Sequence, residues 1–343
     1  MSKNLELGLD TFGDITEDGN GKLKHEAKVL RDLVEEGVLA DQVGVDFLGL
    51  GEHHRKDFAI SSPEILMTYI AAKTERLKLG TSVTVLSSDD PIRVFQRFST
   101  LDALSGGRAE ITLGRGSFTE SFPLFGHDLN QYEVLFEQKL DLLTTLWADE
   151  VVSWSGDIRP PLKRQSVFPR FEDKGPTIWV GVGGSPDSVI RAVTYNLQMM
   201  LAIIGGDPER FKPYVDLYHR ACDQMEHPVK PLGVHSPGHV AETDEAAVEQ
   251  LWPHYKAFHD RLGRERGWSP MGKDAFLSEV RNGSVYAGSP ETVAKRIAKT
   301  MKTLGLSRFD LKYATGPMPH AQLMKSIELY GRKVIPLVRD MMS

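Results

Sequence analysis

Short apolar runs alternate with longer amphipathic segments along most of this 343-residue chain. A short apolar run bounded by turn residues is typical of a buried strand, and a longer segment with a repeat near 3.6 residues is typical of a helix. The apolar runs predict eight strands, at residues 5–10, 47–51, 77–86, 108–113, 177–182, 199–204, 231–240 and 309–313. Because most of these strands are followed by a helix, we predict a (β/α)₈ TIM barrel in preference to an open doubly wound sheet.

The helical patterns fall at residues 26–43, 63–72, 91–104, 132–149, 185–195, 208–225, 244–264, 290–304 and 320–341. Residues 150–176 and 265–288 depart from the strand–helix repeat, so we interpret both as insertions, the first as a hairpin. No internal repeat or flexible linker divides the chain. We therefore expect residues 1–343 to form one barrel domain that carries two insertions.

Charge and cysteine content exclude several classes of protein. Basic and acidic residues are mixed throughout and sum to a formal net charge of -6, which disfavours a nucleic-acid or anionic-membrane partner. A single cysteine, Cys222, rules out an intrachain disulfide framework. The N-terminus lacks the apolar core of a signal peptide, and no apolar run is long enough to span a bilayer. These features predict a cytoplasmic protein.

A charged segment follows the second predicted strand. The active site of a TIM barrel lies at the C-terminal ends of the strands, and the run at 47–51 is followed there by Glu52, His53 and His54. Since a histidine titrates near neutral pH, we predict that His53 takes part in proton transfer and that Glu52 orients it or raises its pKa. We expect His54 to contact a neighbouring loop. No metal centre is predicted, because adjacent histidines rarely bind one ion together.

Two glycine-containing turns follow the fourth and fifth predicted strands. In "VGVGGSP", Gly183, Gly184 and Ser185 precede a helix whose first N–H groups suit a phosphate. In "GRGSF", Arg115 could pair with the same phosphate, and Phe118 could form a wall for a flat ring system. An ordinary strand–helix turn, a loop salt bridge and loop packing are the respective alternatives.

Several motifs together resemble the bacterial luciferase-like, flavin-dependent monooxygenase family. They are "EHH", "GTSVTVL", "LDALSGGRAEITLGRGSF", "VGVGGSP" and "VYAGSPETVAKRI", and their order and spacing extend over almost the whole chain. The resemblance implies a (β/α)₈ barrel, in agreement with the strand count. It also implies reduced flavin mononucleotide (FMN) as the cofactor, or a deazaflavin in some branches.

The resemblance also implies roles for individual residues. Arg115 and the backbone at Gly184 and Ser185 would hold the flavin phosphate, with Gly183 in the same turn. The ring and ribityl chain would lie against Thr81, Ser82, Val83, Gly114 and Phe118, with a non-proline cis peptide at Ser82–Val83. His53 would be the active-site histidine, with Glu52 and His54 as its support. Gly114 stands where luciferases have a reactive cysteine, which argues against light emission from a long-chain aldehyde.

We therefore predict a flavin-dependent monooxygenase that uses reduced FMN and oxygen on a small organic substrate. Reduced nicotinamide, NAD(P)H, would be the reductant, used directly or through a separate flavin reductase, and the resemblance implies a homodimer packed through early helices. The alternatives are a deazaflavin-dependent dehydrogenase and a non-catalytic flavin-binding protein. The roles of His235, Lys312 and Tyr313 stay open, and the substrate would be selected by residues 119–131, 150–176 and 265–288.

Overall fold

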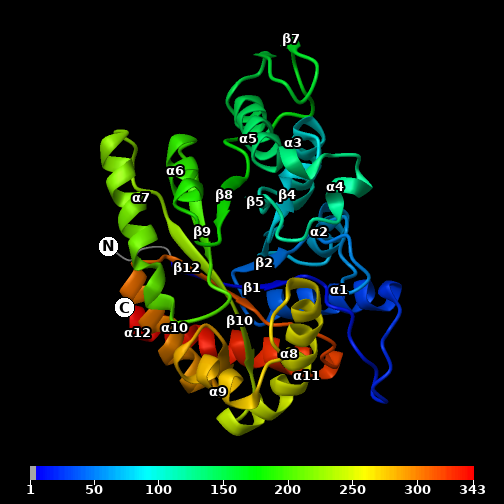
Figure 1. Ribbon diagram of the computed structural model, residues 1–343, viewed down its shortest axis with the longest axis vertical. Helices are drawn as coiled ribbons and strands as arrows, with labels where there is room; N and C mark the ends of the chain where they lie inside the picture. The colour runs from blue at the N-terminus through cyan, green and yellow to red at the C-terminus, as the bar shows by residue number, and fades with distance from the viewer. Residues whose placement is uncertain (1–4) are drawn as a thin grey trace.

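A computed structural model describes residues 5–343 and shows a barrel of parallel strands wrapped by helices (Figure 1). The barrel strands are β1 (Glu6–Thr11), β2 (Phe47–Leu50), β3 (Lys78–Thr81), β4 (Thr84–Val85), β5 (Glu110–Gly114), β8 (Thr177–Val182), β9 (Gln198–Ala202), β10 (Leu232–Val240) and β12 (Arg308–Lys312). They pair in the order β3-β2-β1-β12-β10-β9-β8-β5-β4. A parallel bridge between Leu79 and Ala109 closes the circle between β3 and β5. The predicted TIM barrel is confirmed.

The third predicted strand differs from the single run expected at 77–86. It consists of β3 and β4, which are separated by Ser82 and Val83, and the peptide bond between these two residues is cis. The expected position of the non-proline cis peptide is therefore confirmed. β4 pairs with β5, and β3 pairs with β2, so the two segments occupy one position in the barrel wall.

The helices that cover the barrel are α1 (Glu26–Gln42), α2 (Pro63–Ala71), α3 (Pro91–Ser105), α5 (Tyr132–Ala148), α6 (Pro186–Thr194), α7 (Lys212–Gln224), α8 (Asp244–Arg266), α10 (Pro290–Leu304), α11 (His320–Leu329) and α12 (Ile335–Met342). Local sequence sets several starts. Asp90 accepts from the backbone N–H groups of Ile92 and Arg93 at the start of α3, and Ser289 does the same for Thr292 in α10. A π-helical turn at Tyr330–Val334 separates α11 from α12, where one helix was predicted. None of the helices described for residues 5–343 is both long and apolar enough to cross a membrane.

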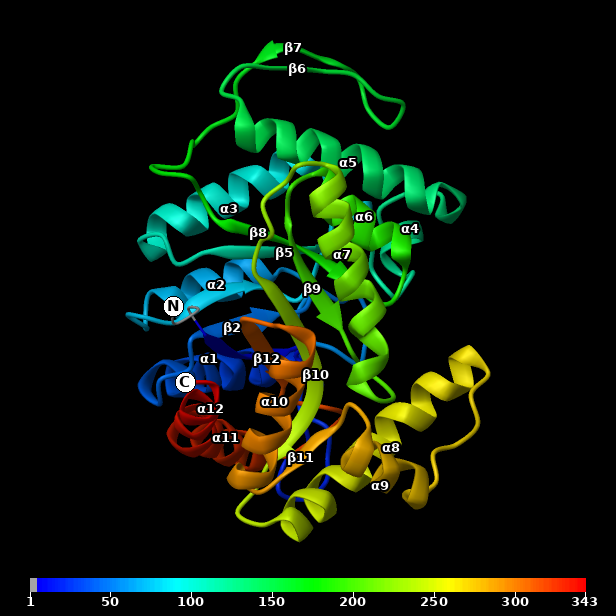
Figure 2. The same cartoon turned by 90° about the vertical axis from the view of Figure 1, so that its left-hand side faces the viewer.

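The two stretches interpreted as insertions lie far apart. In the first, β6 (Val152–Trp154) and β7 (Leu162–Gln165) form an antiparallel hairpin, which projects beyond α5 and α3 (Figures 1 and 2). The second contains α9 (Lys273–Asn282) and β11 (Tyr286–Gly288), which pairs with β10. In both views the hairpin and the α8–α9 region lie at opposite ends of the molecule.

Charged side chains fill the lower half of the barrel, at the N-terminal ends of the strands. Arg308 is 1% exposed and pairs with Glu110 and, at 3.0 Å, with Asp310. Its guanidinium also lies over the rings of Phe47 and Trp179, at 3.5 and 5.0 Å from their centroids. Burial alone would raise the pKa of Glu110, but Arg308 and Lys78 outweigh it and lower that pKa. For Asp310, burial dominates and raises the pKa to about 7.

Glycines in neighbouring strands make room for these large groups. A Cβ at Gly8 would overlap the carboxylate of Asp310, and a Cβ at Gly80 would lie 2.7 Å from the ring of Phe47. Because both glycines lie inside the barrel, the bulky charged layer fits only when its neighbours have no side chain. The interior is thus a packed polar core rather than a channel.

We predict that Arg308→Met lowers the free energy of unfolding at pH 7 by about 3–5 kcal/mol, because two buried carboxylates lose their partner. In the variant their folded-state pKa values are higher and lie above the unfolded values, so the penalty is full above the raised folded-state pKa and shrinks as the pH falls from there toward the unfolded pKa. Urea unfolding at about pH 7.5 and 5.5 measures this.

The matched control for Arg308→Met is Arg332→Met. The Arg332 side chain is 66% exposed, so its replacement should change the free energy of unfolding by less than about 0.5 kcal/mol. An equal loss in both variants, or a larger loss for Arg308→Met at the lower pH, would contradict the predicted role of the buried arginine.

Candidate active site

A cavity of about 370 Å³ lies at the C-terminal ends of the barrel strands. Eight of the eleven residues predicted for the site line it: Glu52, His53, Ser82, Val83, Gly114, Arg115, Phe118 and Gly183. Further lining residues that sequence reasoning did not assign include Phe12, Thr112, Tyr132, Met200 and His235. Only Phe12 directly follows a strand, whereas Thr112, Met200 and His235 lie within barrel strands and Tyr132 begins α5. A search of strand ends could therefore have found Phe12 but not the others.

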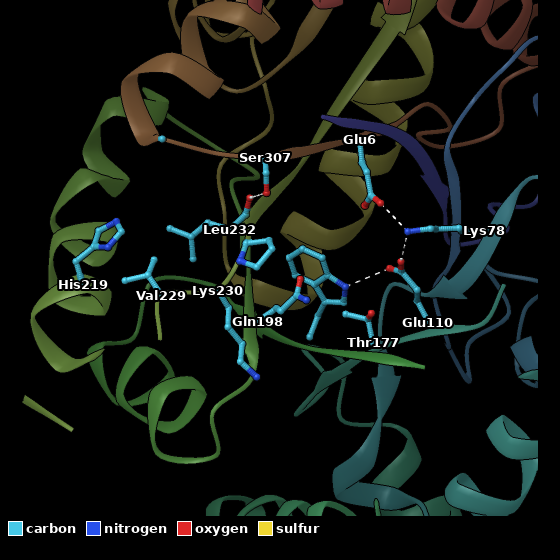
Figure 3. A pocket seen from close by; sticks show the side chains of 13 residues that line it. Glu6, Lys78, Glu110, Thr177, Gln198, His219, Val229, Lys230, Leu232 and Ser307 are labelled. Atoms are coloured by element: carbon cyan, nitrogen blue, oxygen red, sulfur yellow. Dashed lines mark hydrogen bonds and ion pairs between the residues drawn. The ribbon is translucent and has the colours of Figure 1, made fainter. Parts of the chain in front are cut away.

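A second hollow, of about 460 Å³, lies at the opposite end of the barrel (Figure 3). Three of its charged groups are already paired: Lys78 lies between the carboxylates of Glu6 and Glu110, at 2.6 and 3.2 Å, and Trp179 donates to Glu110. Because TIM barrels place catalysis at the C-terminal ends of the strands and use the other end for stability, we assign the active site to the smaller cavity.

His53 lies among aromatic rings in the active-site cavity, at the C-terminal ends of the strands. Its backbone N–H donates to Ile60, and its ring centroid lies 4.5 Å from that of Phe12 and 4.4 Å from that of Phe58. Nδ1 has no hydrogen-bond partner among the described residues. This burial lowers the pKa of His53 to about 3, so the imidazole is neutral at physiological pH.

Glu52 does not support His53 as predicted. Its carboxylate contacts Nε2 of His54 at 2.8 Å and accepts from the backbone N–H of Val85 at 2.9 Å. The prediction that Glu52 orients His53 or raises its pKa is therefore wrong, because consecutive residues after the strand point in different directions. His54 instead packs against Phe125, at 5.0 Å between ring centroids, in agreement with a loop contact.

Thr81, Gly184 and Ser185 do not line the cavity. The hydroxyl of Thr81 is buried in the barrel wall, where it bonds to Thr112 and to the hydroxyl of Thr84. Because alternate residues of a strand face opposite sides, Thr81 lies outside the cavity lining, and its predicted contact with a flavin ring stays a prediction that this lining does not support. Gly184 and Ser185 lie directly behind Gly183 at the start of α6, and the carbonyl of Gly184 accepts from Tyr214 at 2.7 Å.

Arg115 lies at the edge of the cavity between two helices. Its guanidinium pairs with Glu133 in the first turn of α5, and its Nη2 lies 3.4 Å from the hydroxyl of Ser188 in the first turn of α6. The side chain is 27% exposed. Arg115 and the turn at 183–185 are thus adjacent, as the phosphate-clamp interpretation requires.

Phe118 forms one wall of the cavity. It meets the ring of His53 at 5.2 Å and lies between the guanidinium groups of Arg55 and Arg266, at 4.7 and 5.0 Å. Arg55 also pairs with Glu120 and Glu265. These contacts connect the loops after β2 and β5 to the end of α8 and hold the aromatic wall in place.

The two remaining strand-end candidates have different surroundings. His235, on β10, lines the cavity and contacts the carboxylate of Asp10. Lys312 is buried beside the cavity, where it pairs with Asp14 at 3.3 Å, and Tyr313 donates to Glu36 outside the barrel. Lys312 and Tyr313 therefore connect structural elements, whereas His235 faces the cavity.

The model of the luciferase-like monooxygenase family matches residues 11–308. This chain belongs to that family. The match confirms the resemblance seen in the motifs and, with it, the prediction of a flavin-dependent oxidoreductase of the monooxygenase type.

Individual relatives of the luciferase-like family are distant. The alkanal monooxygenase alpha chain of Photorhabdus laumondii is 25% identical over 60% of this chain and 56% of its own length. A solved structure of the oxygenating constituent of 3,6-diketocamphane monooxygenase of Pseudomonas putida, in complex with FMN, has a TM-score of 0.76 at 20% identity, over 97% of this chain and 98% of that chain. An F420-dependent secondary alcohol dehydrogenase has a TM-score of 0.75 at 17% identity, over 98% of this chain and 100% of that chain. These structures show a shared fold.

The stretches predicted to select the substrate contribute unequally to this luciferase-like barrel. Glu120 and Ser121, from the stretch at 119–131, line the cavity. Among residues 5–343, the hairpin at 150–176 and the stretch at 265–288 supply no lining residue, although Glu265 and Arg266 contact the residues around the mouth.

We predict that burial of His53 lowers the folding stability of this protein at acidic pH. The folded state holds His53 neutral down to about pH 3, whereas the unfolded chain binds a proton below about pH 6.5. Its folded pKa is depressed, so stability is unaffected above about pH 6.5 and falls as the pH drops from there toward 3, by at most about 1.4 kcal/mol per pH unit. His53→Phe removes this titration. Urea unfolding between about pH 7 and 5 should show a shallower loss for the variant than for the native protein, and parallel slopes would contradict the assignment.

Proposed function

We propose that this protein is a monooxygenase that uses reduced FMN and molecular oxygen to oxidise a small organic substrate. The observation that carries the proposal is the group at the edge of the cavity, where Arg115 faces Ser188 and the first turn of α6. A helix N-terminus and an arginine together suit a phosphate monoester such as that of FMN. In this proposal Arg115 exchanges Glu133 for the phosphate, and the backbone at Gly184 and Ser185 completes the phosphate site.

The cavity wall also fits a flat ring system. A Cβ at Gly183 would meet no atom within 4 Å, and a Cβ at Gly181 would come no closer than 3.4 Å to its neighbours. A ligand can therefore approach the backbone of β8 closely. Ser82, Val83 and Gly114 line the same cavity, and we propose that the isoalloxazine ring and the ribityl chain lie against them.

Bound reduced flavin would supply the electrons that activate oxygen. The protein side chains would bind, orient and exchange protons. We propose that neutral His53 hydrogen-bonds the reacting group through Nδ1, which has no partner among the described residues. Glu52 would act through position, because it holds the backbone at Val85, two residues beyond the cis peptide.

The source of electrons and the assembly are also proposals. We infer that NAD(P)H reduces the flavin indirectly through a separate reductase, since the described insertions are a hairpin and a short helix–strand segment. We also propose a cytoplasmic homodimer packed through early helices, because Ile65 and Tyr69 on α2 are 74% and 57% exposed. Sedimentation velocity and cell fractionation test these two points.

A deazaflavin-dependent dehydrogenase is the second candidate. The likeness of the barrel to an F420-dependent alcohol dehydrogenase favours it, and the same cavity would hold the deazaflavin ring. Titration of the protein with FMN and with F420, followed by oxygen uptake with the reduced form of each, separates the two. Binding of F420 alone, without oxygen uptake, would overturn the monooxygenase proposal.

We predict that Arg115→Ala weakens FMN binding by about 10- to 150-fold, which corresponds to about 1.5–3 kcal/mol for a charge-assisted hydrogen bond. Riboflavin has no phosphate and should lose far less affinity. Flavin fluorescence titration of both ligands measures the difference. Arg93→Ala, on the exposed face of α3, is the control and should change neither affinity. An equal loss for FMN and riboflavin would exclude the phosphate role.

We predict that His53→Ala lowers turnover by about 10²- to 10⁴-fold while FMN affinity stays near normal. His54→Ala should cost much less, because His54 contacts Glu52 and Phe125. Steady-state oxygen-dependent turnover is measured for both variants with the substrate that a panel of alkanals and cyclic ketones identifies. If His54→Ala loses activity and His53→Ala keeps it, the catalytic histidine has been assigned wrongly.

A further inference from the structure

A second histidine of the cavity is paired with a buried carboxylate. Nδ1 of His235, on β10, lies 2.6 Å from Oδ2 of Asp10, the next-to-last residue of β1. Asp10 is 0% exposed, and the same oxygen accepts from the hydroxyl of Ser82 at 2.7 Å. The contact fixes the ring of His235 and directs one ring nitrogen at the carboxylate.

The other ring nitrogen of His235 is available to a ligand. His235 lines the cavity, and its Nε2 makes no hydrogen bond to the described residues, nor is it among their fully buried unpaired atoms. The ring stacks at 6.0 Å on Phe12, whose other neighbour is the ring of His53 at 4.5 Å. Phe12 thus lies next to two histidines whose environments differ in charge.

The two histidines are suited to different roles. His53 is surrounded by apolar rings and is neutral at physiological pH, so it cannot supply a proton from a charged ring. His235 has the Asp10 carboxylate within hydrogen-bond distance, and that negative charge compensates a positive ring. Two histidines in such different surroundings are suited to different steps of one reaction.

We propose that His235, positioned by Asp10, donates a proton to oxygen as oxygen is reduced in the cavity. This inference rests on the flavin and oxygen chemistry proposed above. Without an organic substrate, bound reduced flavin in its anionic form would supply O₂ with two electrons and one proton. The Nε2–H bond of the His235 imidazolium breaks with its electron pair left on nitrogen, a second O–H bond forms, and hydrogen peroxide leaves. The neutral ring regains its proton from water.

Other charged groups face His235 from the neighbouring strands. Asp10 approaches from β1, and Asp310 lies in register with His235 on β12. Lys312, also on β12, holds its ammonium 4.6 Å from the centroid of Phe12, and His53 lies beyond that ring. On the other side, β9 places Ala202 in register with His235. Among the charged side chains of residues 5–343, Asp10 alone is within hydrogen-bond distance of the ring, so its removal should alter the pH profile most.

The test uses the full chain with bound FMN and needs no organic substrate. FMN on the native protein is reduced without air and then mixed with aerated buffer, and its reoxidation is followed by absorbance between about pH 6 and 9. The variants are His235→Gln, whose amide can still donate to Asp10, and Asp10→Asn. His219→Gln, at the opposite end of the barrel, is the matched control.

For the native protein and the control, we expect reoxidation to slow as the pH rises. His235→Gln should be at least about 10²-fold slower at the acidic end and should lose the pH dependence, with FMN affinity within about threefold of native. In Asp10→Asn the pH profile should differ from that of the native protein, which a purely structural contact would not cause. His53→Gln should keep the pH dependence.

The outcomes separate this inference from the proposed function. If the native protein binds no FMN, the proposed function fails. If it binds and reoxidises FMN but His235→Gln keeps the native rate and pH profile, only the role of His235 is overturned. If His235→Gln does not fold, the Asp10→Asn profile decides, and a rate and pH profile equal to native would overturn the inference.

Discussion

The buried ion group around Arg308 is the constraint on which the rest of the barrel depends. A guanidinium between Glu110 and Asp310 requires the surrounding strands to lie close enough to exclude water. It also requires glycine at Gly8 and Gly80, because any side chain there would overlap the group or its aromatic neighbours. The barrel interior around Arg308 is therefore filled with side chains, and the cavity assigned to the active site lies beyond it, at the C-terminal ends of the strands.

Above this layer the inward-facing residues reach the level of the cavity. β1 contributes Glu6, then Gly8, then Asp10, and β12 contributes Arg308, Asp310 and Lys312 in register with them. The same two-residue periodicity thus places structural charge at the bottom and the Asp10–His235 pair at the level of the cavity. This geometry explains how one barrel separates a stabilising end from a chemical end.

The active-site cavity combines an aromatic wall with the imidazole rings of His53 and His235. Phe118 is held between Arg55 and Arg266, so its ring is a fixed surface against His53. Because Arg55 also binds Glu265, the end of α8 fixes the mouth although it supplies no lining side chain. The hairpin at Val152–Gln165 projects from α5 and α3, on the far side of the molecule from α8 (Figure 2). Of the stretches predicted to select the substrate, the one after β5 thus lines the cavity, and among residues 5–343 the hairpin does not.

Sequence alone determined the barrel, the family and most of the cavity. Repeated apolar runs specify strands, and strand ends meet at one face of a barrel, so the positions of His53, Arg115 and Gly183 in the chain were enough to place them together. The motif around Ser82–Val83 likewise located the cis peptide.

Only the tertiary structure decided which neighbours those residues contact. Glu52 precedes His53 in the chain but binds His54, and Thr81 precedes Ser82 but faces away from the cavity, because adjacent residues point in different directions. The partner of His235 is Asp10, 225 residues away in sequence, and such a pairing depends on barrel closure and register. The surroundings of a histidine depend on these neighbours, so the contrast between His53 among aromatic rings and His235 beside Asp10 could not be predicted from local sequence.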